Sequence, residues 1–184
     1  MADSEITDLL HRWTRGDAQA FDDLVPLVYA DLKQHARRFL MQERHAATLD
    51  CTSLVHEAYL RLVDQNRIQW NGRGHFFGAA AVAMRRVLVE HARQRLAAKR
   101  GSGAVREPLE EDMAVASERD LDVLALDGAL QELAEVDPER ARVVELRYFG
   151  GLSIEETAVV TGTSPSSVTR DWAFARAWLN RRLS

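Results

Sequence analysis

The chain has 184 residues, enough for one large domain or two small ones. A hydrophobic content of 46% is ordinary for a folded globular protein and excludes general disorder. The net charge of −4 argues, taken as an average, against binding of a nucleic acid. That average hides a segregation, because basic residues gather over positions 85–106 and acidic residues over positions 107–122. Such asymmetry predicts a basic working surface followed by an acidic connector.

The residue types predict an all-α fold. Four prolines and ten glycines are few, and Ala with straight-chain residues, which lose little entropy in a helix, dominate the sequence. The amino terminus lacks the basic and apolar regions of a secretory signal. No apolar stretch approaches the ~20 residues that span a bilayer. Because the only cysteine, Cys51, has no partner for an internal disulfide, we expect a soluble, cytoplasmic protein without membrane contact.

Residues 1–100 are predicted to form one helical bundle. Apolar stripes indicate helices over residues 6–13 and 21–39, and Pro26 predicts a kink or a restart in the second. A third helix is expected from about residue 52. After a polar loop over residues 64–74, a long helix should run from about residue 75 to residue 98. Its apolar stripe, which we expect to be buried, consists of Phe77, Ala80, Met84, Leu88 and His91.

Residues 101–120 are predicted to be a flexible acidic linker, and residues 121–184 a second, smaller bundle. Asp137 followed by proline is a strong helix start, since the carboxylate caps the helix and proline fits its first position. Ser153 and Glu156 have the spacing of a capping box. A glycine-containing turn then leads to Ser164 and a proline, which open the last helix. Two helices joined by such a short turn have the dimensions of a helix-turn-helix.

The last helix has a polar face that suits entry into a DNA major groove. Hydroxyls and arginines near a helix amino terminus meet phosphates and base edges in such complexes. The residues on this face are Ser166, Ser167, Thr169, Arg170 and Arg176. An ordinary helical hairpin with a solvated polar face explains the same pattern, and local chemistry alone does not decide between the two.

Three motifs, in order along the chain, resemble the extracytoplasmic-function (ECF) sigma factors. Residues 53–62, SLVHEAYLRL, resemble conserved region 2.2. Residues 73–77 and 84–93 resemble regions 2.3 and 2.4, and residues 146–158 resemble region 4. The resemblance covers nearly the whole chain apart from the linker. It implies a first domain that docks on core RNA polymerase and captures the melted minus-ten element, and a second that reads the minus-thirty-five duplex.

The resemblance and the residue chemistry together give a set of expected contacts. Core polymerase should meet Asp50, Leu54, Val55 and Glu57. The minus-ten DNA should meet Trp70, Asn71, Arg73, Phe76, Arg85, Arg86 and Arg93. An unpaired base needs an aromatic surface to stack on and a polar group to read its edge. The alternative for Trp70 and Phe76, left open by the sequence, is that they anchor the loop to the core.

The sequence departs from the family at the start of region 2.2, where members carry an acidic cluster that meets basic groups of the polymerase. Asp50 and Glu57 remain, but Thr52 and Ser53 replace two inner acids, and the loss should weaken docking. Our hypothesis is that phosphorylation of Thr52 or Ser53, with Thr48 a third candidate, restores the charge. A Ser/Thr protein kinase would then be a partner. The plainer alternative is that Thr52 or Ser53 caps a helix.

The sequence raises two other classes of protein, a helix-turn-helix regulator and an enzyme. A helix-turn-helix regulator that acts without core polymerase explains the last two helices but not the aromatic loop and arginine-rich helix before them. An enzyme is not expected. His56-Glu57 begins like a zinc-protease motif, but Leu60 stands where the second histidine ligand belongs, so we expect no metal, cofactor or catalytic residue. No motif identifies an anti-sigma factor.

Overall fold

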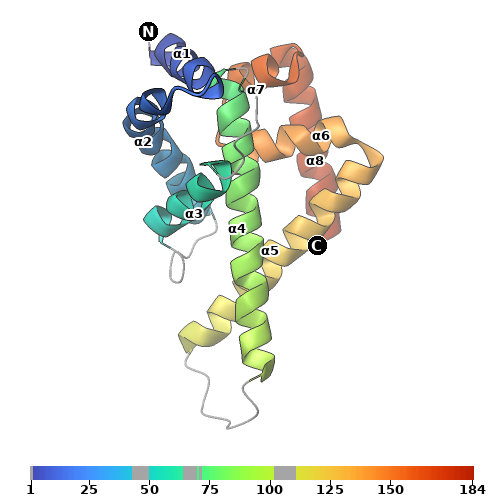
Figure 1. Ribbon diagram of the computed structural model, residues 1–184. Coiled ribbons are helices and arrows are strands. Elements are labelled where there is room, and N and C mark those ends of the chain that lie inside the picture. Colours follow the sequence, from blue (N-terminus) through green and yellow to red (C-terminus); the bar gives the residue numbers. More distant parts are fainter. Residues whose placement is uncertain (1, 43–49, 64–69, 71, 102–110) are drawn as a thin grey trace.

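The computed structural model describes residues 2–42, 50–63, 70, 72–101 and 111–184, and the regular elements in these ranges are all helices (Figure 1). The predicted all-α fold is confirmed. In chain order the elements are α1 (Ala2–Thr14), α2 (Ala18–Gln42), α3 (Cys51–Val63), α4 (Arg73–Gly101), α5 (Glu111–Val136), α6 (Pro138–Val144), the π-helix η1 (Glu145–Phe149), α7 (Ile154–Thr161) and α8 (Pro165–Leu183). We refer to α1–α4 as the N-terminal half and to α5–α8 as the C-terminal half.

The helix ends in the N-terminal half follow the sequence closely, with one exception. Gly16, at φ +94°, and Asp17 separate α1 from α2, and Asp17 caps α2 through the backbone N–H of Ala20. Pro26 lies inside α2, which continues through it, so the restart considered for that position is not found. The long helix α4 starts at Arg73 and reaches Gly101, slightly longer than the prediction.

In the C-terminal half, the predicted caps are present. The Asp137 carboxylate accepts a hydrogen bond from Arg140 N, with proline at the first helical position of α6. Ser153 and Glu156 form both hydrogen bonds of the capping box of α7. Gly162 ends α7 in the left-handed conformation at φ 67°, and Ser164 caps α8. By contrast, α5 already begins at Glu111, inside the stretch predicted to be a linker.

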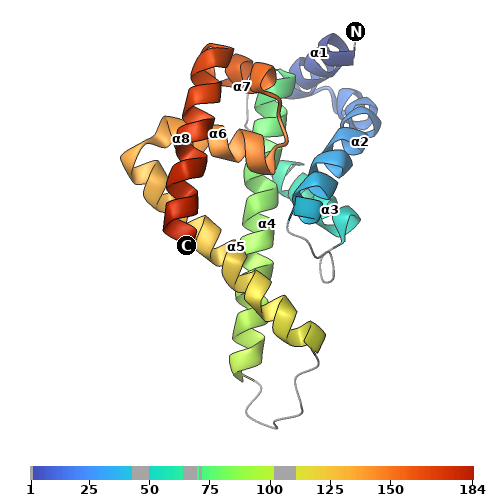
Figure 2. The same ribbon diagram turned by 180° about the vertical axis from the view of Figure 1, so that it is seen from behind.

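Helix α4 is the central column of the molecule. Figure 1 shows α1–α3 on one side of it and α6–α8 on the other, and the view from behind in Figure 2 agrees. A single cluster of buried side chains includes Leu10 of α1, Phe77 of α4, Leu130 of α5 and Leu146 of η1, each at most 1% exposed. The two halves therefore share one hydrophobic core, centred on α4. Within the described ranges no helix combines the length and apolar character required to cross a membrane.

Candidate nucleic-acid interface

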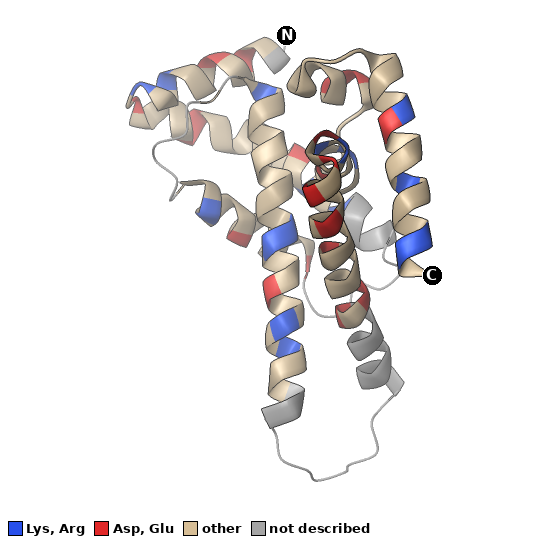
Figure 3. Ribbon diagram, turned by 90° about the vertical axis from the view of Figure 1, so that its right-hand side faces the viewer, with Lys and Arg blue, Asp and Glu red and all other residues tan. Residues whose placement is uncertain are grey.

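Figure 3 shows basic positions along α4 beside acidic positions of the C-terminal half, and ion pairs join Arg85 and Arg95 of α4 to acids of that half. The Arg85 guanidinium lies between two carboxylates, 2.7 Å from Asp127 Oδ1 of α5 and 2.6 Å from Glu145 Oε1 of η1. All three side chains are largely buried, with exposed fractions of 13%, 10% and 19%. Nearer the end of α4, Arg95 pairs with Asp120, whose side chain is 2% exposed. Arg85, one of the residues expected to hold DNA, is thus paired with carboxylates of the same chain.

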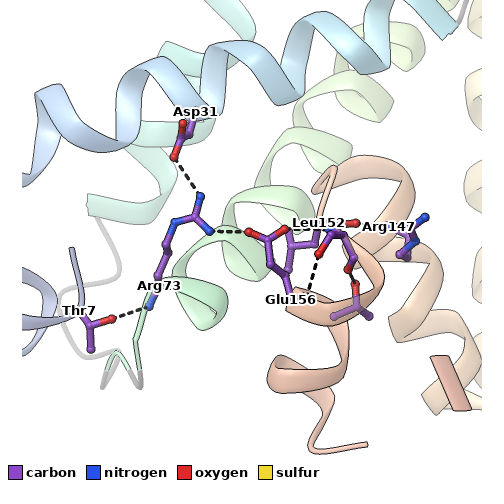
Figure 4. A network of polar contacts seen from close by, with 8 residues as sticks. Thr7, Asp31, Arg73, Arg147, Leu152 and Glu156 are labelled. Atoms are coloured by element: carbon purple, nitrogen blue, oxygen red, sulfur yellow. Dashed lines mark hydrogen bonds and ion pairs between the residues drawn. The ribbon is translucent and has the colours of Figure 1, made fainter. Parts of the chain in front are cut away.

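Arg73, at the start of α4, connects three parts of the chain (Figure 4). Its Nη2 lies 3.0 Å from Asp31 Oδ2 of α2, and its Nη1 lies 2.6 Å from Glu156 Oε1 of α7. Its backbone N–H donates to Thr7 Oγ1 of α1 at 3.3 Å. The guanidinium also lies over the Phe77 ring, 4.7 Å from its centroid. A residue predicted to contact DNA thus joins the two halves in this structure.

Glu156 has two separate tasks. Its Oε2 accepts the hydrogen bond of Ser153 N that completes the capping box, and its Oε1 pairs with Arg73. Burial by itself would raise the pKa of the carboxyl group, but the hydrogen bonds from Ser153 and Arg73 outweigh it and leave the pKa of Glu156 lowered. The charged form is therefore favoured by folding.

This lowered pKa predicts a loss of stability in acid. A carboxyl group with a depressed folded pKa stabilises the protein above its ordinary value of 4.5 and ceases to do so as the pH falls through the folded value. We expect unfolding free energy to fall less between neutral pH and a pH well below 4.5 in Glu156→Gln than in wild type, because the substitution keeps a hydrogen-bond acceptor for the cap but removes the charge. Urea titrations of both proteins at the two pH values measure the difference. An identical decrease in both would contradict the assignment.

The other residues expected at the minus-ten DNA are placed unevenly. Arg86 is exposed, and Arg93 is 65% exposed with Asp127 Oδ2 at 3.6 Å. Trp70 and Phe76 are only 3% and 2% exposed. The Trp70 ring stacks on the Trp13 ring, with 5.8 Å between their centroids. Trp70 and Phe76 therefore anchor the chain to the core in this structure, and neither ring exposes a face on which a base could stack. Asn71 lies outside the described residues.

The polar face predicted on α8 is accessible. Ser166, Thr169 and Arg170 are exposed and Ser167 is half-buried, all within the first turns of the helix. The Ser164 hydroxyl accepts from Ser167 N at 3.1 Å, which fixes the start of the helix. Further along, Arg176 is exposed and lies over the Trp172 ring. The opposite face is buried through Val168, Ala175 and Leu179, as the apolar stripe requires.

Helix α3 carries the residues expected to meet the polymerase. Asp50 precedes the helix and caps it, since its Oδ1 accepts from the backbone N–H of Thr52 at 2.7 Å and of Ser53 at 3.1 Å. The Ser53 hydroxyl donates to Asp50 Oδ2 at 2.7 Å, and these hydrogen bonds lower the pKa of Asp50. The cap is thus Asp50 and not, as the plainer alternative had it, Thr52 or Ser53. Thr52 is exposed, and Thr48 lies outside the described residues.

The remaining predicted polymerase contacts differ in accessibility. Leu54 and Val55 are 1% and 0% exposed, so their side chains hold α3 to the core and do not lie on a surface that a partner touches. Glu57 is half-buried, and both of its carboxylate oxygens lie 3.0 Å from His91 Nε2. The prediction that His91 is buried with the apolar stripe of α4 is therefore wrong, because His91 is half-buried and lies beside Glu57.

Sequence reasoning missed the acidic partners of the arginines. Asp127, Glu145 and Glu156 were not singled out as functional, because a carboxylate on a helix is ordinarily a solvated group. Of the acids of the C-terminal half that pair with α4, only Asp120 lies in the acidic stretch 107–122 that was interpreted as a connector, and no local signal marks the other three. Several arginines of α4 are therefore paired with acids of the same chain.

One of the comparisons with known proteins found a match. A sequence profile described as "ECF sigma factor" matches residues 3–184. Searches of curated proteins and of solved structures gave no match. Since the profile spans nearly the whole chain, the protein belongs to the ECF sigma factor family, a class of transcription factors and not of enzymes.

Proposed function

We propose that this chain binds core RNA polymerase and directs it to specific promoters, under control of phosphorylation on α3. The profile match over residues 3–184 carries the first part, since core polymerase and promoter DNA are the partners that the family implies. The accessible polar start of α8, where Arg170 is an exposed basic residue, supports a role in reading the minus-thirty-five duplex. Arg85, Arg86 and Arg93 are the proposed contacts of the minus-ten strand.

Phosphorylation is proposed because the start of α3 lacks two acids that the family carries. Thr52 is the preferred acceptor, because it is exposed, whereas the Ser53 hydroxyl is held by Asp50. A phosphate at Ser53 would also lose that hydrogen bond and stand beside the Asp50 carboxylate. The side chains of Lys33 and Arg37 act electrostatically on neighbouring Cys51, so positive charge is available near a phosphate at this end of the helix.

The proposed function is tested by measuring the binding of the protein to bacterial core RNA polymerase, with fluorescence anisotropy at moderate salt as the readout. We expect wild type to bind weakly and Thr52→Glu/Ser53→Asp to bind about tenfold more tightly, because added acids at a docking surface meet the polymerase's basic groups. Thr52→Gln/Ser53→Asn is the matched neutral control and should resemble wild type. Tight binding by wild type would support a sigma factor without the phosphorylation switch.

Glutamate is a weak substitute for phosphate, so protein phosphorylated at Thr52 in vitro is measured alongside the acidic variant. If neither form binds core polymerase, the proposed function fails. Footprinting of the free protein tests the alternative, a helix-turn-helix regulator. Such a regulator protects duplex DNA without polymerase, whereas most sigma factors bind duplex DNA poorly alone.

A further inference from the structure

A cavity of about 670 Å³ is lined by residues of α3, α4 and α6. Among the residues that the structure describes, its charged lining consists of three arginines, Arg61, Arg86 and Arg142, and one acid, Glu90. The net charge of the lining is therefore +2. Arg86 and Glu90 are exposed, so the cavity is open to solvent. Sites that bind small molecules typically have volumes of about 300–1,000 Å³.

The protein neutralises only part of this positive charge. Arg61 pairs with Glu90, whose side chain is 51% exposed. Arg142 Nη1 lies 3.4 Å from one oxygen of Glu145, but the other oxygen of that carboxylate already takes part in a closer ion pair. Arg86 forms no ion pair with any residue in the described ranges. Guanidinium groups that lack close acidic partners attract an anion, and phosphate oxygens fit their geometry two at a time.

The uncharged part of the lining is apolar. It consists of Leu62 of α3 and Ala79, Val82 and Ala83 of α4. Leu62 and Ala83 are only 2% and 6% exposed. Positions 79, 82, 83 and 86 are related by spacings of three and four, so the apolar residues of α4 share one side of the helix with Arg86. A ligand in the cavity would meet a charged surface and an apolar surface side by side.

From this lining we infer that the cavity binds a nucleoside polyphosphate, with its phosphate chain between Arg61, Arg86 and Arg142 and its nucleoside against the apolar wall. Three guanidinium groups offer more donors than one phosphate group can use, so a chain of phosphates fits them better. A base supplies the flat apolar surface that inorganic phosphate lacks. Because the arginines come from three helices and line one cavity, they suit a compact ligand better than an extended strand, whose phosphates follow a groove.

The site has a consequence for DNA binding, and this consequence, unlike the site itself, rests on the proposed function. Arg86 is one of the proposed contacts of the minus-ten strand. A phosphate of a bound nucleotide and a phosphate of the DNA strand cannot occupy the same guanidinium group. The nucleotide would therefore act as a competitor of promoter DNA at this residue.

Isothermal titration calorimetry of the full-length protein, at physiological ionic strength and without magnesium, measures binding directly. The ligands are ATP, GTP, inorganic triphosphate, adenosine and a single-stranded DNA oligonucleotide. We expect both nucleotides to bind about tenfold more tightly than inorganic triphosphate, because contact of the nucleoside with the apolar wall adds affinity. Adenosine carries no phosphate and should show no measurable binding.

Substitution of the arginines tests whether the nucleotide binds in this cavity. Arg61→Gln and Arg86→Gln each remove one guanidinium group and should weaken ATP binding about tenfold, the effect of losing one hydrogen-bonded charge. Arg181→Gln is the matched control, because Arg181 is an exposed arginine of α8 that does not line the cavity. We expect this control to bind ATP as wild type does.

Substitution of the acid should have the opposite effect. The hydrogen bond from Arg61 lowers the pKa of Glu90, so this side chain is charged at neutral pH. Glu90→Gln removes its repulsion of phosphate and frees Arg61, and should tighten ATP binding about threefold. Glu135→Gln makes the same change of charge at an exposed position of α5 and should leave the affinity unchanged. A gain in affinity cannot arise from damage to the fold.

Several results would overturn the inference. The nucleotides fail to bind at millimolar concentration, or Arg181→Gln weakens binding as much as Arg86→Gln, which would indicate unspecific attraction. Equal affinities for ATP and inorganic triphosphate would show that the apolar wall holds no nucleoside. Dependence on Arg61 and Arg86 with the oligonucleotide but not with ATP would make the cavity part of the DNA surface instead. No polymerase is present, so a failure of core binding, which would refute the proposed function, is recognised separately.

Discussion

Phe77→Ala is expected to lower the free energy of unfolding by about 3–5 kcal/mol, the range for removing a buried aromatic ring from a core. Phe77 is 1% exposed on α4, where its ring meets Phe76 edge-on and packs against His35 of α2. The ring also supports the Arg73 guanidinium. Its loss therefore leaves a cavity where α2 and α4 meet, and the total stability of such domains is only about 5–15 kcal/mol.

Urea denaturation followed by circular dichroism measures this effect. Phe174→Ala is the matched control, because Phe174 is 45% exposed on α8, where the Arg140 guanidinium lies over its ring. We expect that change to cost about 1 kcal/mol or less. Equal losses in the two variants would mean that Phe77 is not part of the core that joins the helices.

Arg85→Met is expected to destabilise the protein by about 3 kcal/mol. The substitution keeps most of the side chain's volume but leaves Asp127 and Glu145 buried without their principal partner, a change that costs ~3–5 kcal/mol in other proteins. The lower end of that range applies, because Asp127 also accepts from Gln131 and Glu145 lies 3.4 Å from Arg142.

A triple variant separates the charge effect from packing. In Arg85→Met/Asp127→Leu/Glu145→Met all three buried charges are removed, and most of the lost stability should return, since apolar residues of similar size replace buried ion pairs at little cost. Thermal or urea unfolding of the single and triple variants gives the comparison. A triple variant less stable than Arg85→Met would show that the ion pairs contribute stability in their own right.

The sequence predicts best those features that depend on neighbouring residues. The starts of α6, α7 and α8 were predicted from Asp137, Ser153 and Ser164, since a cap acts within one helical turn. The buried stripe of α8 follows equally directly from its spacing. For α3 the local rule was applied two or three positions too late, because Asp50, itself a good cap, stands before Cys51 and the two hydroxyl residues Thr52 and Ser53.

Features that depend on distant residues were not predictable in the same way. Arg85 and its partners at positions 127 and 145 are far apart in the sequence, so no local pattern indicates their pairing. Nothing in the sequence near Gly74 and Gly78 indicates that Val160 and Leu146 pack closely against these two glycines. For Trp70 the sequence left two alternatives, and its burial against Trp13 in this state agrees with anchoring.

The double use of Glu156 has a consequence for variants at Arg73. One carboxylate oxygen pairs with Arg73 and the other accepts from Ser153 N at the start of α7, so loss of the Arg73 pair leaves the capping hydrogen bond in place. In Arg73→Ala we therefore expect amide hydrogen exchange in α7 to remain as slow as in wild type, because the cap acts within the first turn of that helix.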